Sequence, residues 1–355
     1  MSSQAAATDP LGLAGFTFAD LHRPARLREL YERFIEEVAV TEPELWAQWT
    51  QYRELPESLS PVSRGNLVVQ MAPYVSRFVA RLFGVGPEAE TLRASTAAYD
   101  DLFRFKIDFV RRRALPLLKG GASVAASEAE HAFVAGIVAA EASSGVVPVT
   151  PDAELAIARA GCRLLDREEA ARASGTDAEK AAVASGINSL KAWVAAHVHH
   201  PGYRDWVVFR FPEPLEAEHL VHIQRPGPIP EVIIGPDPKL RRRDGFALTD
   251  SRYTTREVLS EIHYCVLCHE RDKDSCSKGL RDKDGKVSIN PLGIELGGCP
   301  LGEKISEMHT LRKAGDAIAA LALVAIDNPM CPGTGHRICN DCMDEHAEAR
   351  GDHRR

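Results

Sequence analysis

Apolar positions in the first half of the chain follow the spacing of amphipathic helices. Between Leu27 and Val38, apolar side chains recur at intervals of three or four, which places them on one helix face. Similar stripes occur in residues 67–83 and 103–117, and the alanine-rich residues 153–173 are typical of closely packed helices. The sequence therefore predicts a mainly α fold for this part of the chain.

Short polar signals mark where several of these helices begin. Ser60 followed by Pro61 indicates a helix start, because proline is favoured at the first helical position. Thr176 and Glu179 form a capping box, which opens a helix that we expect to run to about Val198.

The pattern changes after residue 200, at a His-Pro-Gly break. Trp206–Phe211 has the residue types of a strand, and prolines then punctuate an extended stretch. We expect five parts, namely a disordered N-terminus (1–22), a helical domain of unknown role (23–200), an extended or β connector (201–250), a cysteine-rich domain (251–346) and a polar tail (347–355).

Composition narrows the class of protein. The 355 residues are 45% hydrophobic and 26% charged, which is ordinary globular composition. A net charge of −7 gives no general attraction to nucleic acid or to an anionic membrane. The longest apolar run, Ala317–Ile326, is about half of what a membrane span needs. No signal peptide is visible at the N-terminus, so we expect a soluble cytoplasmic protein with neither nucleic-acid nor membrane partners.

Cysteines supply the candidate chemistry, because seven of the eight follow residue 264. Cytosolic thiols are kept reduced, so such a cluster indicates metal binding or catalysis before disulfides. A C-x2-C pair, as here, brings two sulphurs to one side of a tight turn, which suits a soft metal or an iron–sulphur cluster. The candidate ligands are Cys265, Cys268, Cys276, Cys299, Cys331, Cys339, Cys342 and His346. Cys162 lies apart on an apolar helix face, and we expect it to be a buried small hydrophobe.

Helices are predicted around these cysteines. A capping box at Thr254–Glu257 opens a short helix that ends just before Cys265. Pro300 follows Cys299, which indicates that this cysteine caps a helix over residues 300–313 and lies at its positive end. A second helix is expected over residues 316–325. The nearby histidines His263, His269, His309 and His336 are expected to be structural.

This region resembles a known family. The residues that carry the resemblance are Cys265-x2-Cys268, Cys276, Gly298-Cys299-Pro300-Leu301-Gly302-Glu303-Lys304-Ile305, Asp327-Asn328-Pro329 and Thr334–Cys339. Over about residues 255–346, the chain is similar to the N-terminal iron–sulphur domain of glutamate synthase small (beta) subunits. Related FAD-dependent pyridine-nucleotide oxidoreductases, including dihydropyrimidine dehydrogenase, share this domain.

The resemblance implies a helical, ferredoxin-like domain that relays electrons through one or two 4Fe–4S clusters. It implies that Cys265, Cys268 and Cys276 serve one cluster, and that Cys299, Cys339 and Cys342 serve mainly the other. Cys331 has no clear counterpart in the family, and His346 stands where relatives tend to have a cysteine. FAD and NADPH would then be bound by a partner flavoprotein subunit or by domains absent from this chain, since no G-x-G-x-x-G follows a strand here.

Two alternatives remain open. Groups of C-x2-C spacing are also typical of zinc sites, which would make this a structural or interaction protein with no redox role. The chain could also be a truncated product with an incomplete second cluster. No Ser-His-Asp arrangement, P-loop or HExxH motif is present. We therefore expect an oxidoreductase component without a complete catalytic site of its own.

Overall fold

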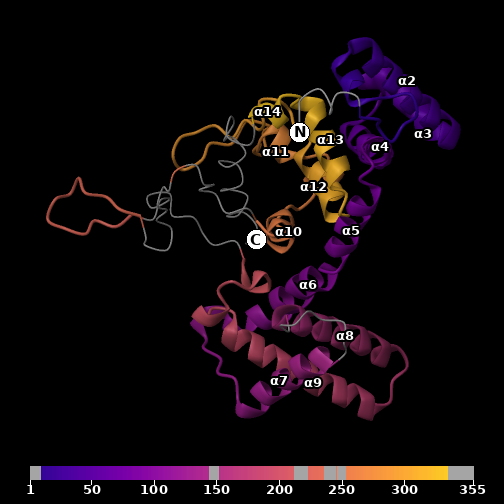
Figure 1. Cartoon of the computed structure of the whole chain (residues 1–355). Coiled ribbons are helices and arrows are strands. Elements are labelled where there is room, and N and C mark those ends of the chain that lie inside the picture. The colour runs from indigo at the N-terminus through magenta and orange to yellow at the C-terminus, as the bar shows by residue number, and fades with distance from the viewer. Residues whose placement is uncertain (1–8, 144–151, 212–222, 236–244, 246–252, 335–355) are drawn as a thin grey trace. The chain divides into compact units, whose positions relative to one another are not determined.

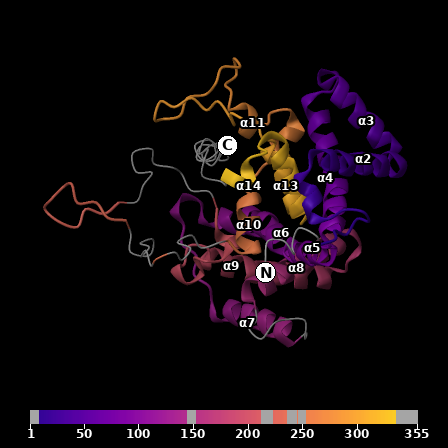
Figure 2. The same ribbon diagram turned by 45° about the horizontal axis from the view of Figure 1, so that its top comes forward.

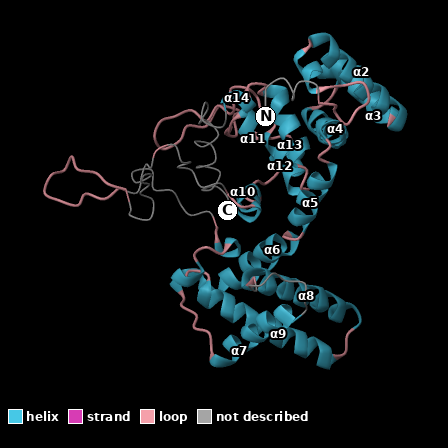
Figure 3. Cartoon of the chain, viewed as in Figure 1, coloured by secondary structure: helices cyan, strands magenta, loops and turns pink. Residues whose placement is uncertain are grey.

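The computed structural model describes residues 9–143, 152–211, 223–235, 245 and 253–334. The fold is mainly α, as predicted, and the described residues contain helices and isolated bridges without a named strand (Figure 3). None of the described helices has the length and apolar character needed to cross a membrane.

Contacts divide the chain into two compact units that interleave along the sequence. Unit 1 consists of Met1–Ala94, Pro212–Thr254 and Tyr264–Arg355, and unit 2 of Ser95–Phe211 and Thr255–His263. The boundary at residue 94 falls inside one helix, α5.

Unit 1 is built from N-terminal and C-terminal helices together. Its helices are η1 (Phe18–His22), α2 (Pro24–Thr41), α3 (Pro43–Glu54), η2 (Pro56–Ser58), α4 (Pro61–Phe83), most of α5 (Gly86–Ala97), η9 (Cys268–Arg271), α11 (Ser275–Lys278), α12 (Ile305–Lys313), α13 (Ala317–Asp327) and α14 (Cys331–Thr334). Helices α12 and α13 lie against α4 in both views (Figures 1 and 2). The apolar contact there is made by Val68, Ala72, Leu311, Ala319, Ala320 and Leu323.

Unit 2 is a helical bundle with its own core. Its helices are α6 (Asp100–Arg104), the π-helix η3 (Phe105–Ala114), η4 (Leu115–Gly121), α7 (Glu128–Ser143), α8 (Ala153–Ser174), α9 (Asp177–His197), η5 (Pro201–Tyr203), η6 (Val207–Phe209) and α10 (Thr255–Ile262). Gly161 of α8 lets Phe105 approach closely, because a Cβ there would lie 2.2 Å from the ring. Cys162 beside it is 2% exposed, which confirms the expected buried cysteine.

Local signals for helix starts are confirmed. Ser60 accepts a hydrogen bond from the backbone N–H of Ser63 at 3.1 Å and caps α4. Thr176 and Glu179 form the predicted capping box at the start of α9. Both signals depend only on neighbouring residues, which explains why the sequence was sufficient to find them.

The expected strand at residues 206–211 is wrong. Val207–Phe209 forms a single 3₁₀ turn, and all three side chains are buried in the core of unit 2. Their strand-like composition reflects burial among helices, since β-branched and aromatic residues suit any apolar core. In the connector, the structure describes residues 223–235, where Gln224 and Ile234 form an isolated antiparallel bridge.

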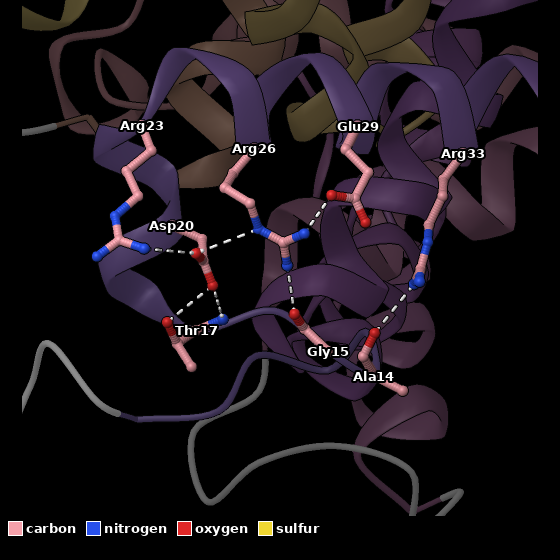
Figure 4. Close-up of polar contacts among 8 residues, drawn as sticks. All are labelled: Ala14, Gly15, Thr17, Asp20, Arg23, Arg26, Glu29 and Arg33. Atoms are coloured by element: carbon pink, nitrogen blue, oxygen red, sulfur yellow. Dashed lines mark hydrogen bonds and ion pairs between the residues drawn. The ribbon is translucent and has the colours of Figure 1, made fainter.

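Residues 9–22 belong to the N-terminal segment that we expected to be disordered. In the structure they are packed on α2 (Figure 4). Asp20 accepts hydrogen bonds from the backbone N–H and the hydroxyl of Thr17, each at 2.9 Å. The Arg26 guanidinium donates to Asp20 at 3.2 Å and also contacts Glu29 and the carbonyl of Gly15. Hydrogen bonds from Thr17, above all the backbone one, lower the pKa of Asp20.

Candidate functional site

The cysteine loop at residues 265–278 winds tightly in unit 1. Leu267 has a left-handed φ of 49°, and its N–H donates to Sγ of Cys265 at 3.4 Å. Asp274 is also left-handed, with φ 44°, and the next N–H, of Ser275, donates to Sγ of Cys268 at 3.3 Å. These two hydrogen bonds fix the sulphurs of the C-x2-C pair against the backbone, which is strained at Leu267 and Asp274 because neither is glycine.

Cys299 does not cap a helix, and this expectation is wrong. Helix α12 begins at Ile305, with Lys304 as its N-cap. Cys299 lies in a turn, where its carbonyl accepts a hydrogen bond from the N–H of Gly302 at 2.9 Å. Gly302 has a left-handed φ of 64°, so a helix cannot run through it from Pro300.

A chain of three polar side chains connects Cys265 to the interior of unit 1. Sγ of Cys265 lies 3.7 Å from the hydroxyl of Ser306 on α12. The same hydroxyl lies 2.6 Å from Nδ1 of His269. Ser306 and His269 are both buried, whereas Cys265 is partly exposed. The arrangement connects a thiol that solvent can reach to a buried imidazole through one hydroxyl.

Two buried carboxylates accompany this chain. Asp274 and Glu307 are 6% and 3% exposed, and one oxygen of each, Oδ1 and Oε2, has no hydrogen-bond partner within the described part of the chain. Burial raises the pKa of Glu307, and the negative charge of Asp274 raises it further. Burial also raises the pKa of Asp274, while the charges of Lys278 and His269 oppose the shift. Buried acids with unsatisfied oxygens are uncommon, and they concentrate at functional sites.

Cationic side chains lie around the same loop. Lys313, at the end of α12, interacts electrostatically with Cys265 and Glu270, although burial lowers the pKa of this lysine. Lys304 donates to both carboxylate oxygens of Asp327, at 2.9 and 2.7 Å.

The motif around Lys304 has a structural role here. Besides the Lys304–Asp327 ion pair, Asn328 donates to Oε1 of Glu303 at 2.8 Å. The Glu-Lys pair before α12 is thus bonded to the Asp-Asn pair at the end of α13. These contacts give a structural role to two of the motifs on which the family resemblance depended.

The predicted ligands fall into two groups. Cys265, Cys268, Cys276, Cys299 and Cys331 lie in the described part of unit 1, and none of them is disulfide-bonded. Cys339, Cys342 and His346 lie outside the described residues. Among the residues that the structure does describe, no group of three or more His, Cys, Asp or Glu side chains is arranged to hold a metal ion. The ligand role of each cysteine stays a prediction.

Sequence reasoning missed the polar residues of this site. Ser306, Glu307 and Asp274 carried no motif, and His269 was expected to be only structural. Ser306 and His269 are 37 residues apart, so no local spacing connects them. The one available signal was the Ser-Glu pair directly after the start of α12, at positions where that helix faces inward.

Comparison with known proteins points to a different group from the one that the cysteines suggested. Residues 11–84, which span α2 to α4, match the family described as RP005 N-terminal alpha-helical domain. The chain is 25% identical over 303 residues to the uncharacterized protein RP005 of Rickettsia prowazekii (strain Madrid E). The alignment covers 81% of this chain and 93% of that protein. No solved structure matches the chain.

These findings overturn the resemblance to glutamate synthase small subunits. The similarity to RP005 extends over most of the chain, and neither match carries any sign of an iron–sulphur or oxidoreductase family. The predicted electron-transfer function is therefore wrong. A ferredoxin-like domain is not shown. The cluster content and the flavoprotein partner stay predictions from the sequence.

Proposed function

We propose that unit 1 carries a nucleophilic thiol, Cys265, and that the chain acts by covalent chemistry on an acyl group. The observation that supports this proposal is the connected set of Cys265, Ser306 and His269. A nucleophile, a connecting hydroxyl and a base within hydrogen-bond reach are the parts that thiol-dependent acyl transfer requires.

The hydrogen bonds allow a proton to leave the sulphur as it attacks. In this arrangement the thiol of Cys265 donates to Ser306, and the hydroxyl of Ser306 donates to Nδ1 of His269. When the hydroxyl proton of Ser306 moves to the imidazole, the thiol proton of Cys265 takes its place on the hydroxyl. The sulphur forms a bond to the acyl carbon, and the leaving group takes a proton back from His269. The product is a thioester on Cys265, which water or a second acceptor then cleaves.

The two buried acids lie within electrostatic range of His269. Both Asp274 and Glu307 interact electrostatically with this imidazole, so an ionised carboxylate at either position stabilises the imidazolium that forms when His269 takes the proton. Lys313 places a positive charge near the sulphur and suits an acyl substrate with an anionic group.

The test uses an activated ester on the full-length protein. With p-nitrophenyl acetate, we expect a burst of nitrophenolate and an acetyl group on the tryptic peptide 257–271, with fragmentation placing it on Cys265. Cys265→Ser should abolish the burst, and Cys268→Ser should keep it. Ser306→Ala and His269→Asn should each slow acetylation by about a hundredfold. This factor is at the lower end of the range of rate losses that follow removal of a general base.

Ser260→Ala is a matched control, because Ser260 is as fully buried as Ser306 but lies in unit 2. It should acetylate at the wild-type rate. Far-UV circular dichroism would establish that each variant is folded. Acetylation of another cysteine, or a folded Ser306→Ala protein that reacts as fast as the wild type, would disprove the proposal.

A further inference from the structure

The backbone brings Cys276 and Cys299 side by side, although they are far apart in the sequence. The N–H of Cys299 donates to the carbonyl of Cys276 at 2.9 Å. A few residues away, the N–H of Leu280 donates to the carbonyl of Leu296 at 3.0 Å. Cys276 lies in the short helix α11, so a helical turn and a loop approach each other here, and one backbone hydrogen bond joins the two cysteines directly.

Two glycines hold these segments in close contact. A Cβ on Gly279 would lie 2.5 Å from the carbonyl oxygen of Leu296, and a Cβ on Gly298 would lie 2.3 Å from the backbone nitrogen of Gly279. Both glycines have left-handed φ angles, of 84° and 85°. Backbone therefore packs directly on backbone beside the two cysteines, and the pairing has little freedom to shift.

This geometry fits the requirements of a disulfide bond. A backbone N–H that donates to the carbonyl of another residue at this distance keeps the two Cα atoms roughly 4.5–6.5 Å apart, because only standard backbone bonds and one hydrogen bond separate them. A disulfide requires Cα atoms roughly 4.4–6.8 Å apart. Both cysteines are partly exposed, so an oxidant can reach them.

We infer that Cys276 and Cys299 are a site of reversible oxidation, which forms an intramolecular disulfide with low-molecular-weight disulfides as oxidants. One thiolate attacks the oxidant, whose S–S bond breaks and releases one thiol. The second cysteine thiolate then attacks the mixed disulfide and releases the other thiol. The protein loses two electrons and two protons, and the oxidant becomes two thiols.

The inference goes beyond the proposed function, because neither cysteine belongs to the set of Cys265, Ser306 and His269. The bond would close the loop between α11 and the turn that precedes α12. Since α12 carries Ser306 and Glu307, oxidation at this site would restrain the segment that leads into the candidate site.

Trypsin makes the test direct, because it separates the cysteines. Cys276 lies in peptide 274–278, Cys299 in peptide 287–304, and Cys265 with Cys268 in peptide 257–271. Full-length protein would be equilibrated in buffers of oxidised and reduced glutathione, blocked with N-ethylmaleimide and digested without reduction. We expect peptide 274–278 linked to 287–304 at about tenfold or more the amount of any other cysteine pair, because the fold supplies a high effective concentration.

Matched variants complete the test. Cys276→Ser and Cys299→Ser should each abolish the linked peptide, leave the remaining cysteine as a glutathione adduct and keep acetylation at Cys265. Cys331→Ser should leave the linked peptide unchanged. Recovery of both cysteines unlinked at every glutathione ratio, or a predominant Cys268–Cys276 link, would overturn the inference. Neither result would bear on the proposal for Cys265, which the acetylation experiment tests separately.

Discussion

Gly65 on α4 lies directly against the carboxylate of Glu307 on α12, so closely that a Cβ at position 65 would be 2.7 Å from Oε1. Glu307 is 3% exposed and has little room to move away. The close contact thus joins two residues that are 242 positions apart in the sequence, within unit 1.

Gly65→Ala should therefore destabilise the protein. We expect a loss of about 1–3 kcal/mol in the free energy of unfolding, the usual cost of overpacking, measured by urea denaturation. Gly136→Ala in α7 is the matched control, because nothing lies within 4 Å of a Cβ at that position. That helical substitution should stabilise by roughly 0.5–1 kcal/mol. Equal effects of the two substitutions would contradict the close contact at Gly65.

Glu307→Gln should raise stability at neutral pH. Burial, together with the charge of Asp274, raises the pKa of Glu307 in the folded protein above its usual value near 4.5. The folded state therefore favours the protonated form, and this stabilisation, fully present below the unfolded pKa, is lost as the pH rises through the folded pKa. Glutamine cannot ionise, so the variant should gain stability relative to the wild type as the pH rises from 4 to 8.

Unfolding free energies measured across that range would check this prediction. Glu36→Gln, an exposed position on α2, serves as control and should leave the pH profile unchanged. A wild-type profile parallel to that of Glu307→Gln would show that the carboxyl group does not titrate abnormally.

Arg256→Met should be strongly destabilising in unit 2. Arg256 donates to Oε2 of Glu154 at 2.9 Å and also contacts Asp152, while Oε1 of Glu154 accepts from the N–H of Val208. Glu154 is 5% exposed, so removal of the cation leaves a buried charge without its counterion. We expect a loss of about 3 kcal/mol by thermal or urea unfolding.

Arg112→Ala provides the comparison for that measurement. Its pair with Asp108, at 2.8 Å, lies on an exposed face, where ion pairs contribute less than about 1 kcal/mol. Similar losses from both substitutions would refute the special role of Arg256.

Cys162 should resist alkylation until unit 2 unfolds. Burial raises the pKa of its thiol to about 12, and the thiol donates to the carbonyl of Asp101 at 3.3 Å. At pH 8, only about one thiol in 10⁴ would be ionised, and the thiolate is the reactive form. Iodoacetamide labelling followed by mass spectrometry should find the peptide with Cys162 unmodified in native protein and modified in urea. Rapid native labelling would show that this helix face opens readily.

Local features of the fold could be predicted from the sequence, whereas contacts between distant segments could not. The caps at Ser60 and Thr176 involve residues within three positions, and the sequence located both. The start of α12 was misplaced because Pro300 is a favourable helix start in isolation, whereas Gly302 takes a left-handed conformation in the folded loop.

The candidate site shows the same limit. The cysteine spacing drew attention to the segment in which the unusual polar contacts occur, but the electron-transfer function inferred from it is wrong. Ser306 meets His269 only because α12 packs beside the cysteine loop, and the unsatisfied oxygens of Asp274 and Glu307 depend on burial by several helices. No periodicity or motif in the sequence predicts contacts of this kind between distant residues.

The interleaving of the two units has a consequence for synthesis on the ribosome. Ser76 of α4 donates to Asp316, at the start of α13, across 240 positions of sequence. At translation rates of roughly 5–20 residues per second, α4 emerges about 12–50 s before the helices that cover it. During that interval its apolar face, with Val68 and Ala72, has no native partner in α12 or α13. The nascent chain therefore presents a surface suited to chaperone binding while unit 2 is being made.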